Sequence, residues 1–418
     1  MARLSRRRGL TLASLLALAL AVPAASAHSA PSESQTTHHP PAASTSWVGS
    51  WAAAPSHGEG GQTGYPGRTF RNVVHLSIGG SAIRVKFSNA FGTTPLPLAS
   101  ATVALAADPG APTAVRGTMR QLTFGGADEV LIPPGAEVLS DPVNLRVRDG
   151  ADLLVSTYVA EPAGPVTSHR FAWTTSFYAD GGDYTARESG SAFTGTTDAW
   201  FYVTEVVVKN PQARGAVVTL GDSITDGSES TFGANGRWPD LLGERLRRHG
   251  IQMGVLNAGL VGNRLLMDSQ HPEGIFGVNA LSRFDRDVLA RAGVRSVIVL
   301  LGINDIQQEP HQTDPARITF ALSQLDARAN AVGVRTVCAT LMPFNGWDSY
   351  TEELEVTRQG VNAAIRRGLC DSVVDFDAVV RDPADPTRMR AEYDSGDGLH
   401  PNDAGMRAMA QAVPLHAL

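Results

Sequence analysis

The 418-residue chain has only two cysteines, Cys338 and Cys370, and two cysteines without a nearby histidine pair do not make a zinc site. It has no long basic run after the first few positions, and its formal charge is −6, so we expect no nucleic-acid partner. No apolar run reaches the roughly 20 residues that a membrane-spanning helix needs. With 42 glycines and 25 prolines, the composition is neither collagen-like nor disordered, and the length suggests two or three globular domains.

Residues 1–27 have the pattern of a secretory signal peptide. Four arginines precede an apolar run at 10–22, and a small-residue cleavage pattern follows at 25–27. Cleavage after Ala27 would change the formal charge from −6 to −10 and release a secreted, extracellular protein. Residues 5–7 read SRR, which leaves the general and the twin-arginine export routes both open. Residues 28–46, rich in Ser, Thr, Pro and His, are expected to be a disordered linker. Export would permit a disulfide between Cys338 and Cys370, although two separate buried thiols stay an alternative.

Residues 47–210 are expected to be an all-β domain. Apolar residues alternate with polar ones at 83–87, 145–148 and 153–159, and frequent Gly and Pro turn signals separate these runs. Short strands with such turns are typical of a β-sandwich or jelly roll.

Residues 211–418 show alternating strand and helix patterns. We expect five strands, at 217–220, 255–256, 297–301, 334–342 and 373–376. We expect helices near 237–248, from Asn279 to before Gly293, from Asp314 to before Gly333, around 351–367 and over 402–412. This order predicts a three-layer α/β domain with a five-stranded parallel sheet.

Three polar motifs lie beyond the carboxyl ends of the expected strands, which is where a parallel sheet places its active site. Residues 221–227 read GDSITDG and place Ser223 just after a buried strand. Residues 302–305 read GIND, so Asn304 can donate to a developing oxyanion. Near the carboxyl terminus, Asp397 precedes His400 by three residues and can orient its imidazole. Alone, each motif could be a helix cap or turn, but the three together are much more specific than any one of them.

The set resembles the SGNH, or GDSL-like, hydrolases, which carry Gly-Asp-Ser, a downstream Gly, Gly-x-Asn and Asp-x-x-His in this order. The second block is identified as residues 257–263, NAGLVGN, in which Gly262 resembles the oxyanion glycine and Gly259 is the alternative. Residues 283–288 and 374–383 are similar to a secreted bacterial branch with an extra amino-terminal β domain, as are WVGSW at 47–51 and IRVKFSN at 83–89. Ile224 departs from the family's usual Leu but keeps its apolar bulk.

The resemblance implies a flavodoxin-like fold and ester hydrolysis through a covalent serine ester. Ser223, His400 and Asp397 would form the triad, and the oxyanion hole would combine the N–H groups of Ser223 and Gly262 with the side chain of Asn304. Small esters, acyl lipids and acylated polysaccharides are all compatible substrates. We expect a monomer that needs no cofactor and no metal. The acidic residues around the serine, Asp222, Asp226 and Asp305, are expected to brace the loops by hydrogen bonds rather than bind a cation.

Aromatic residues in the loops after the strands are candidates for substrate binding. Trp238, Phe344 and Trp347 could line an acyl site or stack on sugars. The alternative function is a carbohydrate- or surface-binding protein whose hydrolase domain is vestigial. The complete set of five site residues disfavours that alternative, because a decayed site should have lost at least one of them.

Overall fold

The computed structural model describes residues 47–418, so the expected signal peptide and linker lie outside the described residues. Residues 47–418 belong to one compact unit. Within the described part of the chain, no helix is long and apolar enough to span a membrane.

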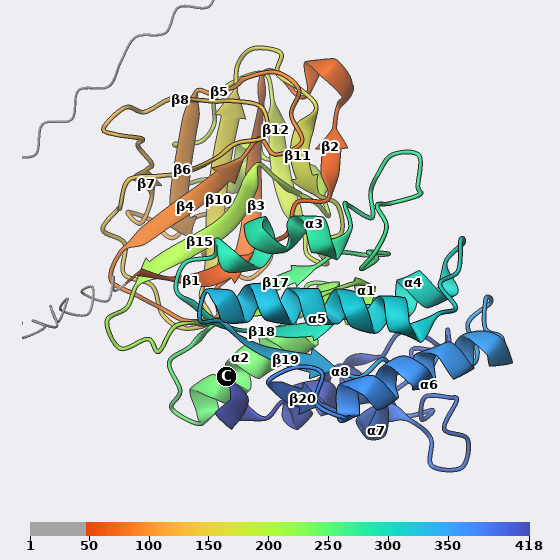
Figure 1. Cartoon of the computed structure of the whole chain (residues 1–418). Helices are drawn as coiled ribbons and strands as arrows, with labels where there is room; N and C mark the ends of the chain where they lie inside the picture. Colours follow the sequence, from red (N-terminus) through yellow and green to blue (C-terminus); the bar gives the residue numbers. More distant parts are fainter. Residues whose placement is uncertain (1–46) are drawn as a thin grey trace, which may run out of the picture. The chain divides into compact units, whose positions relative to one another are not determined.

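The amino-terminal region of this unit is built mostly of β-strands, as predicted (Figure 1). Its strands and short 3-10 turns are β1 (Trp47–Ala52), β2 (His57–Glu59), η1 (Gly61–Thr63), β3 (Arg68–His75), β4 (Ile83–Ser88), β5 (Leu96–Leu98), β6 (Ser100–Leu105), β7 (Arg120–Gln121), β8 (Val130–Ile132), β9 (Glu137–Leu139), β10 (Asp152–Val159), β11 (Val166–His169), β12 (Ser176–Asp180), η2 (Gly190–Ala192), β13 (Gly195–Thr197), β14 (Trp200–Phe201) and β15 (Val203–Lys209).

Two antiparallel sheets dominate the β region, in the orders β1-β15-β4-β9 and β13-β12-β3-β10-β6-β7. The expected alternation is present in β4, where Ile83, Val85 and Phe87 are buried in the same apolar core as residues of β6 and β10. The prediction of a strand at 145–148 is wrong, because in the described residues Val147 forms an isolated bridge with Gly80 and no continuous strand. An alternating pattern buries a face without requiring a continuous partner strand.

The second half of the chain is the predicted three-layer α/β fold. Its elements are β16 (Ala216–Gly221), α1 (Ser223–Asp226), α2 (Trp238–Arg248), β17 (Gly254–Gly259), α3 (Ala280–Phe284), the π-helical turn η3 (Asp285–Leu289), β18 (Val294–Leu300), α4 (Ile303–Gln307), α5 (Pro315–Ala331), β19 (Arg335–Ala339), α6 (Glu352–Arg366), β20 (Ser372–Val374), α7 (Phe376–Val380), α8 (Asp403–Ala412) and the 3-10 turn η4 (Leu415–Ala417).

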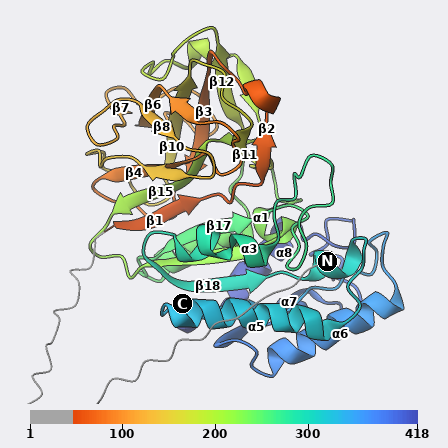
Figure 2. The ribbon, with the colours of Figure 1, turned by 45° about the horizontal axis from the view of Figure 1, so that its top comes forward.

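The five strands of this half form one parallel sheet in the order β17-β16-β18-β19-β20. This is the flavodoxin-like order, and its switch point lies where β16 separates β17 from β18. The helices pack in two groups, α2 with α8 and α7, and α5 with α3 and α6. Figure 2 shows β17 above β18, and α5 runs below β18 with α6 beside it. The sheet therefore brings the loops after β16, β17 and β18 together at one edge.

The β region and the parallel sheet meet along β1 and β17, which lie side by side in both views (Figures 1 and 2). The approach is so close that a Cβ on Gly254 would lie 2.0 Å from the Gly49 carbonyl oxygen. The Gly49 N–H donates to the Ala292 carbonyl across the same junction, at 2.8 Å. The two regions are thus packed backbone to backbone.

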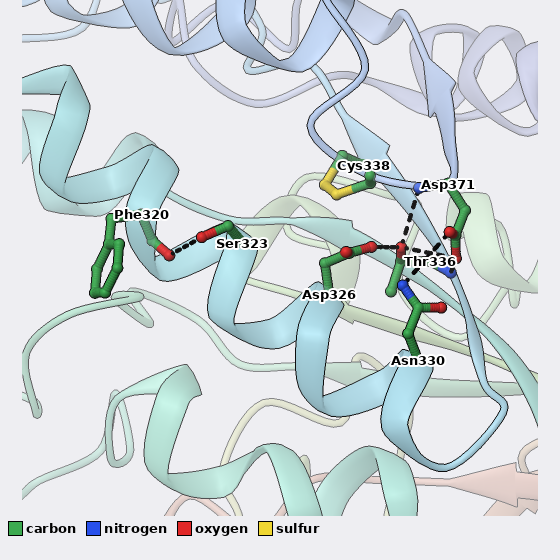
Figure 3. The surroundings of a disulfide bond; sticks show 8 residues. Phe320, Ser323, Asp326, Asn330, Thr336, Cys338 and Asp371 are labelled. Atoms are coloured by element: carbon green, nitrogen blue, oxygen red, sulfur yellow. Dashed lines mark hydrogen bonds between the residues drawn. A yellow bond between two sulfur atoms is a disulfide. The ribbon is translucent and has the colours of Figure 1, made fainter.

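A disulfide joins Cys338 of β19 to Cys370, which precedes β20, with 5.8 Å between their Cα atoms. Figure 3 shows Thr336 beside it, hydrogen-bonded to Asp326 and Asp371. The bridge encloses α6, the helix that crosses from β19 to β20.

Candidate active site

Ser223 lies at the point where β16 turns into α1. Asp222 caps this short helix, because its Oδ1 accepts the Ile224 N–H at 3.1 Å. Ser223 is the first helical residue, so its N–H has no acceptor within the helix. Its side chain is nearly buried, at 5% exposure. A rigid strand end and a capped helix therefore fix the hydroxyl.

The structure brings Ser223, His400 and Asp397 into one hydrogen-bonded line. Ser223 Oγ lies 2.9 Å from His400 Nε2, and His400 Nδ1 lies 2.6 Å from Asp397 Oδ2. The other oxygen of Asp397 accepts the N–H groups of Leu399 and His400, each at 2.8 Å. A carboxylate against Nδ1 keeps the proton on that nitrogen, which leaves Nε2 to accept the serine proton.

The electrostatics of Asp397 favour its ionised form. Partial burial acts to raise the pKa of its carboxyl group, but the hydrogen bonds from the His400 ring and from the two N–H groups outweigh burial. The net result is a pKa well below the ordinary range for Asp. The group beside the imidazole is therefore a carboxylate throughout the neutral pH range.

Gly262 lies in the loop after β17, and Asn304 lies in α4, the short helix that follows β18. Gly262 has a φ of 69°, and its N–H makes no hydrogen bond within residues 47–418. The Asn304 Nδ2 donates one hydrogen bond to the Asn263 carbonyl at 3.0 Å, and its Oδ1 accepts from Gln307 Nε2 at 2.7 Å. These two contacts fix the amide and leave the second Nδ2 hydrogen uncommitted.

Gly259, the alternative to Gly262, lies at the end of β17. Its N–H already donates to Asn257 Oδ1 at 2.8 Å. Gly262 is therefore the better candidate for an anion-binding N–H.

Two acidic residues brace the loop that carries Gly262. Asp226 Oδ2 accepts the Val261 N–H at 3.2 Å, and Asp305 accepts the two N–H groups of residues 265–266 at 2.7 and 2.9 Å. Within the described residues, no group of three or more His, Cys, Asp or Glu side chains is placed to hold a metal ion. The hydrogen bonds of these two carboxylates fit the bracing role that the sequence suggested.

Asp222, the residue before Ser223, is fully buried. Burial raises the pKa of its carboxyl group to about 7, against the opposing effects of the Ile224 N–H and the nearby His400. Its Oδ2 has no hydrogen-bond partner among residues 47–418. Asp222 is therefore a buried carboxyl group whose ionisation the fold disfavours.

Residues 219–408 match the model of the GDSL-like lipase/acylhydrolase family. This part of the chain belongs to that family. The protein is therefore a carboxylic ester hydrolase, and the predicted SGNH resemblance is confirmed. No curated protein matches the chain.

Three solved structures illustrate the range of similar folds. They are Est24, a carbohydrate acetylesterase from Sinorhizobium meliloti (16% identity, TM-score 0.38), the aryl esterase of M. smegmatis (20%, 0.38) and a GDSL-like lipase from Bacteroides thetaiotaomicron (17%, 0.35). Each covers 47% of this chain, and the matched part is 95%, 95% and 84% of their own lengths.

Of the three aromatic candidates for substrate binding, only Trp347 borders the site of this GDSL-like hydrolase. Its ring lies 5.7 Å from the His400 ring. The predictions for Trp238 and Phe344 are wrong, because both side chains are fully buried. Trp238 begins α2 and packs edge-on against Phe376, and Phe344 packs against Tyr350.

Gln307 and Phe276 contact Asn304 and Gly262, and the sequence did not single out Gln307. Gln307 holds Asn304, and the only local signal was its position three residues later on α4. Phe276 covers Gly262, since a Cβ there would lie 2.5 Å from the phenyl ring. Nothing in the spacing of the two residues indicated that contact.

Proposed function

We propose that this chain is a secreted serine esterase in which Ser223, His400 and Asp397 are the catalytic triad. The observation that carries the proposal is the continuous contact from Ser223 Oγ through the imidazole to Asp397, at 2.9 and 2.6 Å. The uncommitted N–H of Gly262 and the fixed amide of Asn304 support it.

In the proposed reaction, His400 takes the proton of Ser223 as the serine oxygen attacks the ester carbonyl. Asp397 keeps the ring in the required tautomer and stabilises the imidazolium. The tetrahedral oxyanion would accept hydrogen bonds from the N–H groups of Ser223 and Gly262 and from Asn304 Nδ2. His400 then protonates the leaving alcohol as the bond to it breaks, which leaves a covalent serine ester. In the second step of the reaction, His400 activates the water that hydrolyses this ester and frees the acid.

For the substrate, we propose small carboxylic esters, acyl lipids or acylated polysaccharides. The Trp347 ring beside His400 suits an acyl chain or a sugar face equally well. For the location, the charged and apolar pattern of residues 1–27 and the disulfide between Cys338 and Cys370 support secretion, because disulfides persist in oxidising compartments.

The decisive experiment is hydrolysis of an aryl acetate by the wild-type protein and by Ser223→Ala. We expect the variant to lose about 10⁵-fold or more in kcat. Equal rates for the two proteins would overturn the proposal and favour a binding function. A panel of aryl esters of increasing chain length, run beside acetylated xylan, separates the substrate classes.

A further inference from the structure

His169, in the β region, reaches the hydrolase half of the chain. It ends β11, its side chain is only 3% exposed, and its Nε2 lies 3.1 Å from Oδ1 of Asp226, the last residue of α1. Its other contacts are the carbonyl oxygens of Ala54, 2.7 Å from Nδ1, and Phe171, 3.1 Å from Nε2.

Among residues 47–418, every hydrogen-bond partner of the His169 ring is an acceptor. A carbonyl faces Nδ1, and a carbonyl and a carboxylate face Nε2, so both nitrogens need a proton to satisfy these contacts. Burial alone would lower the pKa of the ring, but the charge of Asp226 and the three hydrogen bonds raise it above the ordinary value for His. The pair is therefore an imidazolium against a carboxylate, enclosed between the two regions.

The second oxygen of Asp226 accepts the Val261 N–H at 3.2 Å, one residue before Gly262. Asp226 also belongs to the single turn of helix that Ser223 begins, and its own N–H donates to the Asp222 carbonyl at 2.9 Å. One carboxylate thus joins the turn that carries the nucleophile to the loop that carries the oxyanion glycine.

Two arginines lie near the His169–Asp226 pair, but their hydrogen bonds go to other groups. Arg283 contributes positive charge near Asp226, but its NH1 and NH2 groups bind the carbonyls of Ala258 and Gly221 at 2.8 and 3.0 Å. Arg237 lines the same small cavity as His169 and Asp226, and its Nε is bound to Asp240 at 2.6 Å. Oδ1 of Asp226, the oxygen that does not accept the Val261 N–H, is hydrogen-bonded by His169.

We propose that His169 is a positioning residue, through which the β region holds Asp226 and so sets the Gly262 N–H against Ser223. The inference rests on the proposed oxyanion role of Gly262. It assigns the β region a part in the reaction, beyond supporting the fold or binding a polymer. A shift of about 1 Å in a catalytic group can cost about 100-fold in rate.

The test uses His169→Asn in the full chain. Asn can still donate to the Ala54 carbonyl but is too short to reach Asp226. We expect kcat for an aryl acetate to fall about 10- to 100-fold, with KM changed by less than about threefold, because the loss concerns the transition state. His169→Gln, whose amide can reach Asp226, should recover most of the kcat.

The matched control is His75→Asn. His75 pairs with Asp152 at 2.6 Å in the same β region, and in the part of the chain that the structure describes its ring makes no hydrogen bond to the hydrolase loops. We expect its kcat to stay within about twofold of the wild type. A folded His169→Asn with wild-type kcat would overturn the positioning role. It would leave the esterase proposal intact, because Ser223→Ala tests that proposal separately.

Asp226→Asn serves as the second variant if His169→Asn does not fold. Its amide nitrogen must face either the Val261 N–H or the His169 ring, so one of the two contacts is lost. We expect a fall in kcat of about tenfold or more, and a wild-type kcat would overturn the proposal.

Discussion

Trp347 lies edge-on to His400, with 5.7 Å between the ring centroids and an angle of 86° between the planes. Its Nε1–H donates to Gln307 Oε1 at 2.9 Å, and Gln307 Nε2 donates to Asn304 Oδ1 at 2.7 Å. The indole beside the proposed base and the amide of the proposed oxyanion hole are therefore held by the same glutamine. The orientation of Asn304 therefore depends on a residue that, within residues 47–418, makes no hydrogen bond to Ser223 or His400.

Replacing Gln307 by Met should free the Asn304 amide while nearly preserving side-chain volume. Complete loss of an oxyanion donor costs about 10²–10³ in kcat, so we expect a smaller fall of about tenfold for a donor that can rotate. Steady-state hydrolysis of an aryl acetate measures it. The control is Gln359→Met on α6, because the Gln359 side chain donates to Glu355 at 2.8 Å and makes no other hydrogen bond within the described residues. An unchanged kcat in Gln307→Met would show that Asn304 needs no such support.

Asp397→Asn tests the role of the carboxylate. An amide nitrogen facing Nδ1 would favour the tautomer with its proton on Nε2, which cannot accept the serine proton. We expect kcat to fall about 10⁴-fold, with the fold intact by circular dichroism.

The control for that variant is Asp394→Asn in the same loop. Asp394 accepts the N–H groups of Gly396 and Gly398 at 2.8 and 3.1 Å, and within the described residues it makes no hydrogen bond to the His400 ring. We expect Asp394→Asn to lose less than about tenfold. Similar losses in both variants would mean that Asp397 acts only by shaping the loop.

The disulfide between Cys338 and Cys370 should contribute to stability. It closes a loop across a sequence separation of 32 residues, and chain entropy then predicts a loss of about 3–4 kcal/mol in the free energy of unfolding when both cysteines become serine. Denaturant unfolding of the double variant measures the loss. Because the bridge joins β19 to the turn before β20, kcat of the folded variant should be unchanged. A stability equal to that of the wild type would contradict the prediction.

Local patterns were enough to predict the parallel sheet and most of its helices. Buried strands are recognisable as short apolar runs, and Asp314-Pro315 starts α5 as such a pair should, because a cap and a proline act within one turn. The site motifs could be predicted for the same reason, since each directly follows a strand and a parallel sheet gathers those ends at one edge.

Side-chain direction and contacts between the two regions could not be predicted in this way. Trp238 was a reasonable pocket residue by its position, but packing against Phe376 directs it into the core. His169 of β11 meets Asp226 of α1 across 57 positions in sequence. No periodicity or spacing encodes such a contact, which depends on how β11 docks beside α1.

Asp222 should make the stability of the protein depend on pH. Its pKa is about 7 in the folded protein because of burial, and about 3.9 is the ordinary value for an unfolded chain. Between these two values the folded state holds a proton that the unfolded state has lost, so stability falls as pH rises from about 4 to about 7. The full difference is worth on the order of 4 kcal/mol.

Asp222→Asn removes this ionisation, because an amide stays neutral at every pH. We therefore expect the Tm of Asp222→Asn, relative to the wild type, to be higher at about pH 8.5 than at about pH 5, by several degrees. Thermal unfolding at the two pH values measures the shift independently of activity. Asp108→Asn, at an exposed turn, is the control and should show no such change. A Tm difference between Asp222→Asn and the wild type that is the same at both pH values would mean that Asp222 ionises without cost in the folded state. The Asp222 carboxyl group would then have to be reached by water or by a cation.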